Sequence, residues 1–321
     1  MSNSELTLER YAPEFQTPWD SVVASARSQH FMFRRAYMDY HQDRFEDASW
    51  ILFTGSDPIA VFPASRDGDM LTSHGGLTFG GLLSDERLGL AQTIAALDLL
   101  IAELANTGIR TLEYKPMPHP YQRLPADEDL YALHALGATV VKREVTTAIP
   151  PRAEVRTSQE RRRGLRRFRQ LGLEVSESDD VERFALLLRN VLASRHNAAP
   201  VHSADELRLL KDRFPENIRL FVTASPDDDE LLAGVLIFQT ATVAHAQYIA
   251  ASDAGRESAA LDGIFDHLIH ERYPHLWFDF GISNGRTGEL NVGLLRNKEG
   301  YGGRTVLHDR YRLDVARAVL S

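Results

Sequence analysis

The chain has 321 residues, 43% of them hydrophobic and 25% charged, which suits one large or two medium globular domains. A formal net charge of −9 argues against a general DNA or RNA binder, and the absence of cysteine excludes disulfides, thiolate metal sites and a cysteine nucleophile. The start lacks the features of a signal peptide, and the most apolar long segment, 88–105, carries Gln92, Asp98 and Glu103. We therefore expect a cytoplasmic protein with no membrane span.

The first half of the chain predicts a mixed α/β module. Its glycine-containing turns separate strand-like segments, and Ser84 and Gly108 have the residue types that begin and end a long helix. The expected elements are a helical region at 18–46, strands at 49–54, 59–64 and 70–73, a helix from Ser84 to Gly108, a strand at 109–115, a helix at 128–136 and a strand at 138–149.

The second half, which begins near Pro150, predicts a similar series of elements. Thr157 with Glu160 and Ser203 with Glu206 have the spacing of capping boxes that open helices. The expected elements are an arginine-rich helix ending at Gly172, a strand at 173–176, helices at 181–195 and 203–214, strands at 218–224, 231–239 and 243–251, a helix at 257–272, a strand at 276–280, a short helical piece and a strand at 305–313.

Both halves give helices, three strands, a helix, a strand, a short helix and a strand. We find no convincing residue-level repeat, so the similarity rests on the order of elements. The prediction is an α/β protein of two modules, 1–150 and 151–321, with mixed, mostly antiparallel sheets flanked by helices. The order of strands and helices matches the acetyltransferase fold called GNAT (acyl-CoA N-acyltransferase).

Six segments carry a family resemblance. The second half contributes RRRGLRRFRQLGLEV (161–175), HAQYIAASDAGRE (245–257) and WFDFGIS with KEGYGGR (277–283 and 298–304), and the first half contributes YMDYHQDRFED (37–47), SHGGLTFGGL (73–82) and YKPMPHPYQRLPADEDLYAL (114–133). Together they resemble the Fem-type peptidoglycan aminoacyltransferases and related GNAT-fold proteins associated with bacterial surface-polysaccharide genes. The resemblance spans nearly the whole chain. It implies two tandem GNAT-like modules, the second of which holds the donor and carries most of the chemistry.

The resemblance places the acyl donor, most simply acetyl-CoA, on the strand 243–251 and the turn that follows it. The donor-binding candidates there are Ala250, Ser252, Gly255 and Arg256, because a helix start with Gly255 and Arg256 can bind an anion. The usual acetyl-CoA signature, (Gln/Arg)-x-x-Gly-x-(Gly/Ala), is not cleanly present, which leaves an aminoacyl-tRNA donor open. Lys298 either contacts a phosphate group or forms a solvated pair with Glu299 before a glycine-rich bend.

Three residues are candidates for the catalytic work. Acyl transfer to an amine or hydroxyl requires a base, a donor to the oxyanion and in-line placement of the substrates. His245 is either a base in the acceptor cleft or a hydrogen-bonded core histidine. Asp279, between two phenylalanines, either acts as a base and orients the acceptor or hydrogen-bonds the nearby glycine turns. His196, in the segment HNAAPVHS, is a further candidate acid or base, and this assignment rests partly on the resemblance.

Acceptor-binding candidates come from both halves. Strict alternation along the strand 243–251 puts Gln247 on the same face as His245 and Tyr248 on the other. His202 contacts the acceptor or merely precedes the Ser203 cap. The full set is His74, Lys115, Tyr121, His202, Gln247, Tyr248, Ser283 and Glu299. The alternative for the first half is a degenerate structural copy whose glycines only make turns.

Two further patterns bear on partners. Arg162, Arg166 and Arg169 have the spacing of one helix face, which is either solvated or a contact for a phosphate-bearing acceptor or tRNA. No helical His-Glu-x-x-His spacing occurs, so we expect no metal.

The leading hypothesis is an acyltransferase that moves an acyl group, most simply acetyl, to an amino or hydroxyl group of a cell-surface glycan precursor or another small molecule. One alternative is an aminoacyl-tRNA-dependent aminoacyltransferase of Fem type. The other is a non-catalytic glycan-binding or scaffold module.

Overall fold

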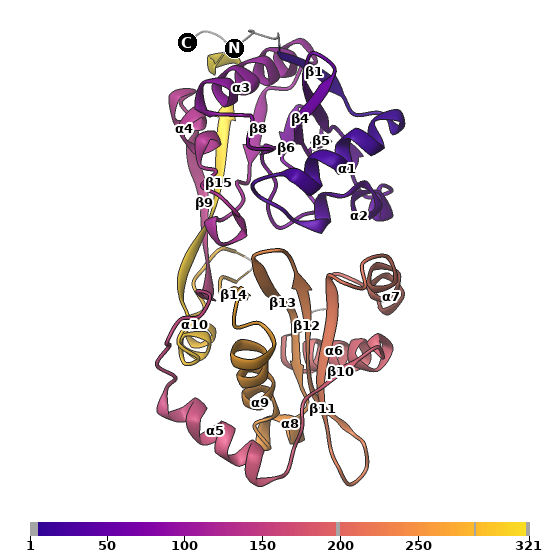
Figure 1. The fold of residues 1–321 in the computed structure, drawn as a ribbon, viewed down its shortest axis with the longest axis vertical. Coiled ribbons are helices and arrows are strands. Elements are labelled where there is room, and N and C mark those ends of the chain that lie inside the picture. Colours follow the sequence, from indigo (N-terminus) through magenta and orange to yellow (C-terminus); the bar gives the residue numbers. More distant parts are fainter. Residues whose placement is uncertain (1–5, 197–199, 286, 319–321) are drawn as a thin grey trace. The chain divides into compact units, whose positions relative to one another are not determined.

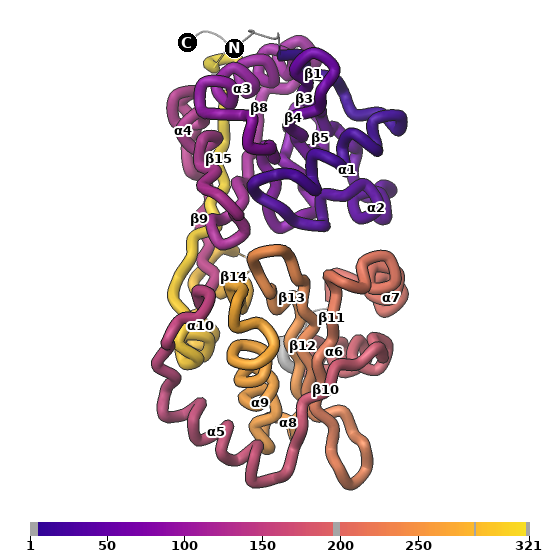
Figure 2. Tube along the Cα trace, in the orientation of Figure 1, coloured from indigo at the N-terminus to yellow at the C-terminus, as the bar shows by residue number. Residues whose placement is uncertain are grey.

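A computed structural model describes residues 6–196, 200–285 and 287–318, with the backbone alone at 195 and 196. The chain forms two compact units (Figures 1 and 2). The first unit joins Met1–Glu144 with Leu307–Ser321, and the second unit is Val145–Val306. The last part of the chain therefore belongs to the same unit as its beginning.

The first unit combines two groups of strands with one long helix. Its elements are β1 (Leu6–Arg10), α1 (Gln16–Ser25), α2 (Arg35–Met38), β2 (Glu46–Asp47), β3 (Trp50–Thr54), β4 (Asp57–Phe62), β5 (Ser65–Asp67), β6 (Met70–Thr72), β7 (Leu83–Ser84), α3 (Leu90–Asn106), β8 (Thr111–Tyr114), α4 (Glu128–Ala135), the end of β15 (Arg304–Asp314) and α11 (Val315–Ala318), with 3-10 turns at Pro13–Phe15, Phe31–Phe33, Asp39–His41 and His119–Tyr121. The strand orders are β1-β3-β4-β7 and β15-β8-β6-β5-β2. Within the described residues of this unit, β6 and β8 run parallel, and the pairs β1–β3, β3–β4, β4–β7, β15–β8, β5–β6 and β2–β5 are antiparallel.

The second unit is one sheet with helices on both faces. Its elements are the end of β9 (Thr139–Ile149), α5 (Gln159–Gln170), β10 (Ser176–Ser178), α6 (Val181–His196), α7 (Ala204–Arg213), β11 (Ile218–Ala224), β12 (Leu231–Gln239), β13 (Val243–Ala251), α8 (Asp253–Glu257), α9 (Ala260–His267), a π-helical turn (Leu268–Arg272), β14 (Trp277–Ile282) and α10 (Val292–Glu299). The strand order is β10-β11-β12-β13-β14-β9. The pair β13–β14 is parallel, and its neighbours are antiparallel.

The two halves of the sequence exchange their last strands. The end of β9, from the first half, pairs with β14 in the second unit through Thr146, Ala148 and Ile149. The end of β15, from the second half, pairs with β8 in the first unit over Tyr311–Asp314. Each unit therefore needs a strand that the other half of the sequence encodes.

The core of the second unit lies between the sheet and α9. Val235 and Ile237 of β12 are buried with Ile264 and Phe265 of α9. The other face packs against α6 at Gly234, where a Cβ atom would lie 2.6 Å from Phe184 (Figure 1). A glycine is required there because only hydrogen leaves room for the aromatic ring.

Several predicted boundaries are wrong, for local reasons. The helical region expected at 18–46 is broken into α1, α2 and 3-10 turns, because the backbone is extended at Ala26 and Arg34. Ser84 lies in β7, paired with Ala60, and the long helix begins only after Gly89. The arginine-rich helix is capped by Ser158 rather than Thr157, since the Ser158 hydroxyl accepts the Arg161 N–H. Local residue types do not decide between such neighbouring caps.

No helix in the described residues is long and apolar enough to cross a membrane. Within the same residues, no group of three or more His, Asp or Glu side chains is arranged to hold a metal ion.

Candidate active site

A β-bulge in β13 determines which side chains share a face. Leu236 of β12 pairs with Tyr248, and Phe238 pairs with His245, so one residue, Gln247, is extra in β13. Because Leu236 and Phe238 point to the same face, His245 and Tyr248 do too. The prediction that Tyr248 lies on the face opposite His245 is therefore wrong, because the extra residue shifts the alternation.

Beyond the bulge, β13 and β14 separate. The parallel pairing covers only Val243–His245 and Trp277–Asp279. β14 then continues along β9, with Ile282 opposite Thr146. Among the described residues, no strand therefore pairs with this edge of β13 from Gln247 to Ala251, and its backbone N–H and C=O groups can bind a ligand.

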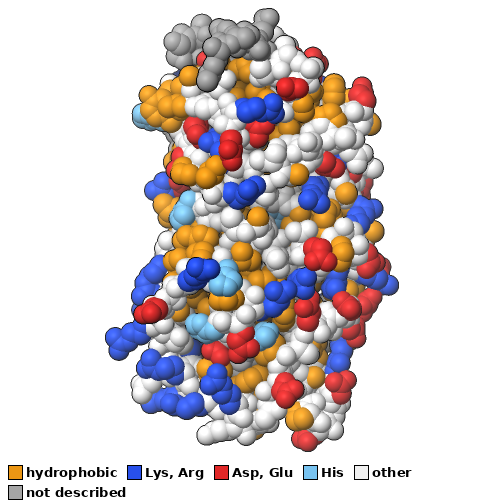
Figure 3. Space-filling model, in the orientation of Figure 1, with side chains coloured by type: hydrophobic (Ala, Val, Ile, Leu, Met, Phe, Trp, Pro, Cys, Tyr) orange, Lys and Arg blue, Asp and Glu red, His pale blue; other side chains and the backbone are white. Residues whose placement is uncertain are grey.

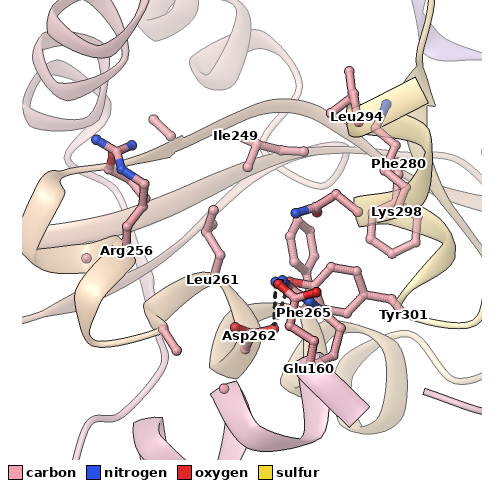
Figure 4. Close-up of a pocket in the computed structure, with 18 of the residues that line it drawn as sticks. Glu160, Ile249, Arg256, Leu261, Asp262, Phe265, Phe280, Leu294, Lys298 and Tyr301 are labelled. Atoms are coloured by element: carbon pink, nitrogen blue, oxygen red, sulfur yellow. Dashed lines mark hydrogen bonds and ion pairs between the residues drawn. The ribbon is translucent and has the colours of Figure 1, made fainter. Parts of the chain in front are cut away.

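A cavity of about 1110 Å³ occupies the region between the separated strands and the helices. Apolar side chains line its middle, and Figure 4 shows Arg256 and Lys298 on opposite sides of it, with Ile249 and Leu261 between them. Its lining includes Ile249, Ala250 and Ala251 of β13, Phe280 of β14, Leu261 and Phe265 of α9, Val191 of α6, Leu294 and Lys298 of α10, and Arg161, Arg167, Arg256, Glu160, Glu257 and Asp262. An apolar channel with cations at its rim fits an elongated ligand that carries negative charge.

A buried polar cluster closes one side of this cavity. The Tyr301 hydroxyl donates to Asp262 Oδ1 at 3.0 Å, and Arg161 Nη1 donates to the same atom at 3.1 Å (Figure 4). Burial raises the pKa of Asp262. The cluster depends on close helix packing, because a Cβ atom on Gly164 of α5 would lie 2.2 Å from Asp262. Neither the cluster nor the role of Gly164 could be predicted, because no local pattern links 161, 262 and 301.

The predicted donor-binding turn is largely engaged by its own scaffold. The Ser252 hydroxyl accepts the Gly255 N–H at 3.0 Å and donates to the Leu232 carbonyl at 3.2 Å. Gly255 approaches β12 so closely that a Cβ atom would lie 1.9 Å from the same carbonyl oxygen. Arg256 Nη1 donates to the Ala251 carbonyl at 2.6 Å. Gly255 and Arg256 line the cavity, as does Ala250, whereas Ser252 acts as a helix cap.

His245 and Asp279 form a hydrogen-bonded pair at the point where the strands separate. His245 Nδ1 lies 2.9 Å from Asp279 Oδ2, and the carboxylate is 1% exposed. Asp279 Oδ1 accepts the Gly281 N–H at 2.9 Å and the Thr146 hydroxyl proton. A carboxylate beside Nδ1 holds the proton there and leaves the lone pair on Nε2. For Nε2 the structure records no hydrogen-bond partner among the described residues, so this nitrogen can serve as a base.

Lys298 fixes the turn that follows β14. Its ammonium donates to the carbonyls of Gly281 and Ile282, at 2.7 and 2.9 Å. Burial lowers the pKa of Lys298 to about 8, although the charge of Asp279 opposes the shift. Lys298 also lines the cavity, so it combines a structural contact with a position beside the proposed donor.

The half-buried Tyr248, on the same face of the sheet as His245, and the buried His202 form a second hydrogen-bonded pair. The Tyr248 hydroxyl lies 2.6 Å from His202 Nδ1. Burial raises the pKa of Tyr248 to about 12, so the phenol stays protonated near neutral pH. His196 is the last residue of α6, and its side chain lies outside the described part of the structure.

The remaining acceptor-binding candidates do not gather at one place. Gln247 is half-buried at the bulge, and Ser283 is fully buried, with its N–H donating to the Val145 carbonyl at 2.8 Å. Glu299 is half-buried at the end of α10 and is absent from the cavity lining among the described residues. Gln247, Ser283 and Glu299 are therefore dispersed, and none of them is among the described residues that line the cavity.

His74, Lys115 and Tyr121 lie in the first unit. His74 adopts a left-handed backbone (φ 54°), and burial lowers the pKa of its imidazole to about 3. The Lys115 ammonium donates to the carbonyls of His74 and Leu77. Tyr121 is 1% exposed and packs on Phe79, with ring centroids 4.7 Å apart. All three are integrated into the core of that unit.

Comparison with known proteins identifies the fold. Residues 155–286 match the family model described as Acetyltransferase (GNAT) domain. The structure of FemX has 12% sequence identity and a TM-score of 0.67, over 95% of this chain and 96% of that chain. The structure of L-PGS from Bacillus licheniformis has 14% identity and a TM-score of 0.63, over 97% and 96%.

No curated protein has a sequence that matches this chain. At sequence identities of 12% and 14%, these similarities establish the fold alone. The matched GNAT domain, residues 155–286, contains the separated strands β13 and β14 and much of the cavity lining. The predictions of a mixed α/β, GNAT-like fold and of a resemblance to Fem-like proteins are confirmed. The chain has a GNAT fold with a Fem-like architecture, and the acetyltransferase domain matched at residues 155–286 supports an acyltransferase.

Proposed function

We propose that the chain transfers an acyl group, most simply acetyl from acetyl-CoA, to an amino or hydroxyl group of a cell-surface glycan precursor in the cytoplasm. The observation that carries this proposal is the His245–Asp279 pair, placed where β13 and β14 separate. Neither residue is among the described residues that line the large cavity, but Phe280, which follows Asp279, is. A base next to an opening for an elongated donor is the arrangement that acyl transfer requires.

The second unit fits an acyl-CoA donor. The free edge of β13, from Gln247 to Ala251, offers backbone partners for the amide groups of a pantetheine arm. Ile249, Leu261 and Phe280 supply an apolar wall, and Arg167 and Arg256 supply positive charge for the phosphates. When bound, acyl-CoA supplies an activated acyl thioester.

The residues of this chain then act on the acceptor. His245 Nε2 takes the proton of the attacking nitrogen or oxygen while that atom bonds to the acyl carbon and the carbonyl oxygen gains negative charge. The carbon–sulfur bond then breaks, and the leaving thiolate takes the proton from the imidazolium. Asp279 stabilises the imidazolium that forms, since its Oδ2 stays bonded to the Nδ1 proton. Backbone N–H groups at the bulge, beside Gln247, are suited to stabilise the developing oxyanion. His196 stays a predicted acid or base, and His202 and Tyr248 stay predicted acceptor contacts.

The test is thiol release from acetyl-CoA in the presence of amino-sugar nucleotides, with His245→Gln as the variant. His267→Gln is a matched control, because His267 lies in the same unit, is hydrogen-bonded to Glu271 and is not among the described residues that line the cavity. We expect turnover in the wild type and the control, and loss of turnover in His245→Gln. Full activity in His245→Gln would overturn the assignment of the base.

An aminoacyl-tRNA donor is the second candidate, and the observation that favours it is the basic surface of α5. Arg162, Arg163, Arg166 and Arg167 are exposed, and Lys and Arg side chains gather over this helix (Figure 3). Arg169 is paired with Asp266 at 3.0 Å. Replacing Arg162, Arg166 and Arg169 together with alanine distinguishes the donors: this variant should lose activity with charged tRNA and keep it with acetyl-CoA. Activity with neither donor in the wild type would favour the glycan-binding or scaffold module.

A further inference from the structure

We infer that Thr146 of β9 is a positioning residue for His245, acting through the second oxygen of Asp279. The inference rests on the proposed function, in which His245 is the base. It adds a third member to the pair, and this member comes from the strand that the first half of the sequence contributes to the second unit.

The contacts of the Asp279 carboxylate define the role. One oxygen, Oδ2, bonds His245 Nδ1 at 2.9 Å. The other, Oδ1, receives the Thr146 hydroxyl proton and the Gly281 N–H. Thr146 is itself 1% exposed, so water does not compete for its hydroxyl.

Two donors on Oδ1 restrict rotation of the carboxylate. The terminal torsion of an aspartate is broad when nothing holds it, so a single contact to His245 would leave the carboxylate plane poorly defined. Side-chain and backbone donors at Oδ1 fix this plane and with it the direction of Oδ2. The imidazole is thereby held in one tautomer and one orientation, as hydrogen-bonded second partners do for histidine ligands and bases.

Local strand geometry explains why Thr146 reaches Asp279. Asp279 of β14 pairs with Ala148, but Ile282 pairs with Thr146, so β14 has one residue more than β9 over this stretch. The irregularity contains Gly281, whose φ of 78° is in the left-handed region. Bulges re-aim side chains next to functional sites. Here the bulge brings a hydroxyl from β9 to a carboxylate of β14.

Thr147 provides a matched control on the same strand. It is 0% exposed, and in the described part of the chain its hydroxyl has no hydrogen-bond partner. Valine has nearly the shape of threonine but lacks the hydroxyl. Thr147→Val should therefore remove no hydrogen bond of the described residues, whereas Thr146→Val removes the one to Asp279. Thr146→Ser keeps the hydroxyl and tests whether that group is the cause.

The experiment measures two quantities on the full-length protein. The first is kcat/KM for acyl transfer across the pH range, with the KM for the donor determined separately. The second is the NMR signal of the His245 Nδ1 proton, which is assigned by its loss in His245→Gln. Thermal unfolding of each variant confirms that it is folded.

We expect Thr146→Val to lower kcat on the order of tenfold without changing the donor KM, and to shift or broaden the Nδ1 proton signal. Thr146→Ser and Thr147→Val should resemble the wild type in both measurements. The inference is overturned if Thr146→Val and Thr147→Val give the same kcat and the same signal. Should Thr146→Val fail to fold, Thr146→Ser decides, since a large loss of kcat with the hydroxyl present contradicts the inference.

The failure of this inference can be separated from the failure of the proposed function. Full activity in His245→Gln shows that His245 is not the base, whatever Thr146 does. The NMR signal still reports whether Thr146 positions the imidazole. An inactive His245→Gln combined with an unchanged Thr146→Val supports the base and rejects the role of Thr146.

Discussion

The two units contain the same pair of parallel strands but place different chemistry on it. In the first unit Thr72 of β6 lies opposite Glu113 of β8, and in the second unit His245 of β13 lies opposite Asp279 of β14. Both carboxylates are buried. At this position of the parallel pair, opposite the carboxylate, the second unit has the histidine His245 and the first unit has the threonine Thr72.

The exchanged strands give the two carboxylates different partners. Glu113 is paired with Arg312 at 2.6 Å and Arg310 at 3.3 Å, both from β15. Asp279 receives a neutral hydroxyl, that of Thr146, from β9. Two arginines neutralise a carboxylate and hold it in ion pairs, whereas a hydroxyl leaves its charge available to an imidazole. If His245 is the proposed base, the partner strand decides whether the carboxylate at this position is held in ion pairs or is available to a histidine.

The openings next to the paired strands differ as well. After β6 the chain stays bonded to the extension of β8, since Gly80 N–H donates to the Lys115 carbonyl at 2.7 Å. Gly80 is so close to Ser73 that a Cβ atom would lie 2.0 Å from its carbonyl oxygen. In the second unit the strands separate, and a cavity of about 1110 Å³ lies beside them. This contrast supports the proposal that the second unit binds the donor.

The largest predicted effect comes from replacing Asp279, the carboxylate proposed to act with His245, and leaving the ion-paired Glu113 intact. Asp279→Asn should lower kcat roughly 10²- to 10⁴-fold, because the amide cannot stabilise the imidazolium or hold the tautomer. Steady-state kinetics with acetyl-CoA measures this loss. Glu113→Gln, the corresponding change in the first unit, should lower the unfolding temperature and leave kcat nearly unchanged. Equal losses of kcat in both variants would show that the two units do not differ as described.

A smaller effect is expected from the two buried lysines. Lys115 and Lys298 each donate to two backbone carbonyls, but only Lys298 lines the cavity. Lys298→Met should weaken donor binding roughly tenfold, about 1.4 kcal/mol, by loosening the turn at Gly281 and removing a positive charge. Lys115→Met should leave the donor Kd unchanged. A titration of each variant with acetyl-CoA measures both dissociation constants. Weaker donor binding by Lys115→Met would contradict the proposed difference between the two lysines.

A modest dependence of stability on pH should follow from Lys115. Burial lowers the pKa of its ammonium to about 7, from 10.5 in the unfolded chain. Between these values the unfolded state binds more protons than the folded state, so the free energy of unfolding should rise as the pH increases from about 7 toward 10.5. Below about pH 7 this rise is absent, because both states are protonated.

Urea unfolding at pH 7, 8 and 9 measures that rise. Lys115→Met should flatten the curve, whereas replacing the more accessible Lys142, which pairs with Glu144 at 2.8 Å, should leave the rise in place. An unchanged curve in Lys115→Met would show that the buried amine is not its source.

Much of the second unit was predictable from local patterns. The strands predicted at 218–224, 231–239 and 243–251 agree with β11, β12 and β13, because polar turns separate their apolar runs. The Ser203–Glu206 capping box is present as predicted. Local signals suffice where each element is bounded by its own turn or cap.

The rest depends on contacts between distant segments. The exchange of β9 and β15, the bulge at Gln247 and the contact between Thr146 and Asp279 join residues that are far apart in sequence or shift a register by one. The helical region at 18–46 is broken where buried aromatic side chains pack; there the Trp19 indole donates to the Phe33 carbonyl at 2.7 Å. Tertiary packing overrides local propensity in such segments.

The most direct test of the account is a calorimetric titration of the protein with acetyl-CoA, with free CoA as the comparison. Leu261→Trp fills the middle of the cavity, and Leu209→Trp, at a 39% exposed leucine of α7, is its matched control. If this cavity holds the donor, the wild type and Leu209→Trp should bind acetyl-CoA saturably, and Leu261→Trp should lose binding. Absent binding to the wild type, or equal binding to both tryptophan variants, would contradict the claim that this cavity holds the donor.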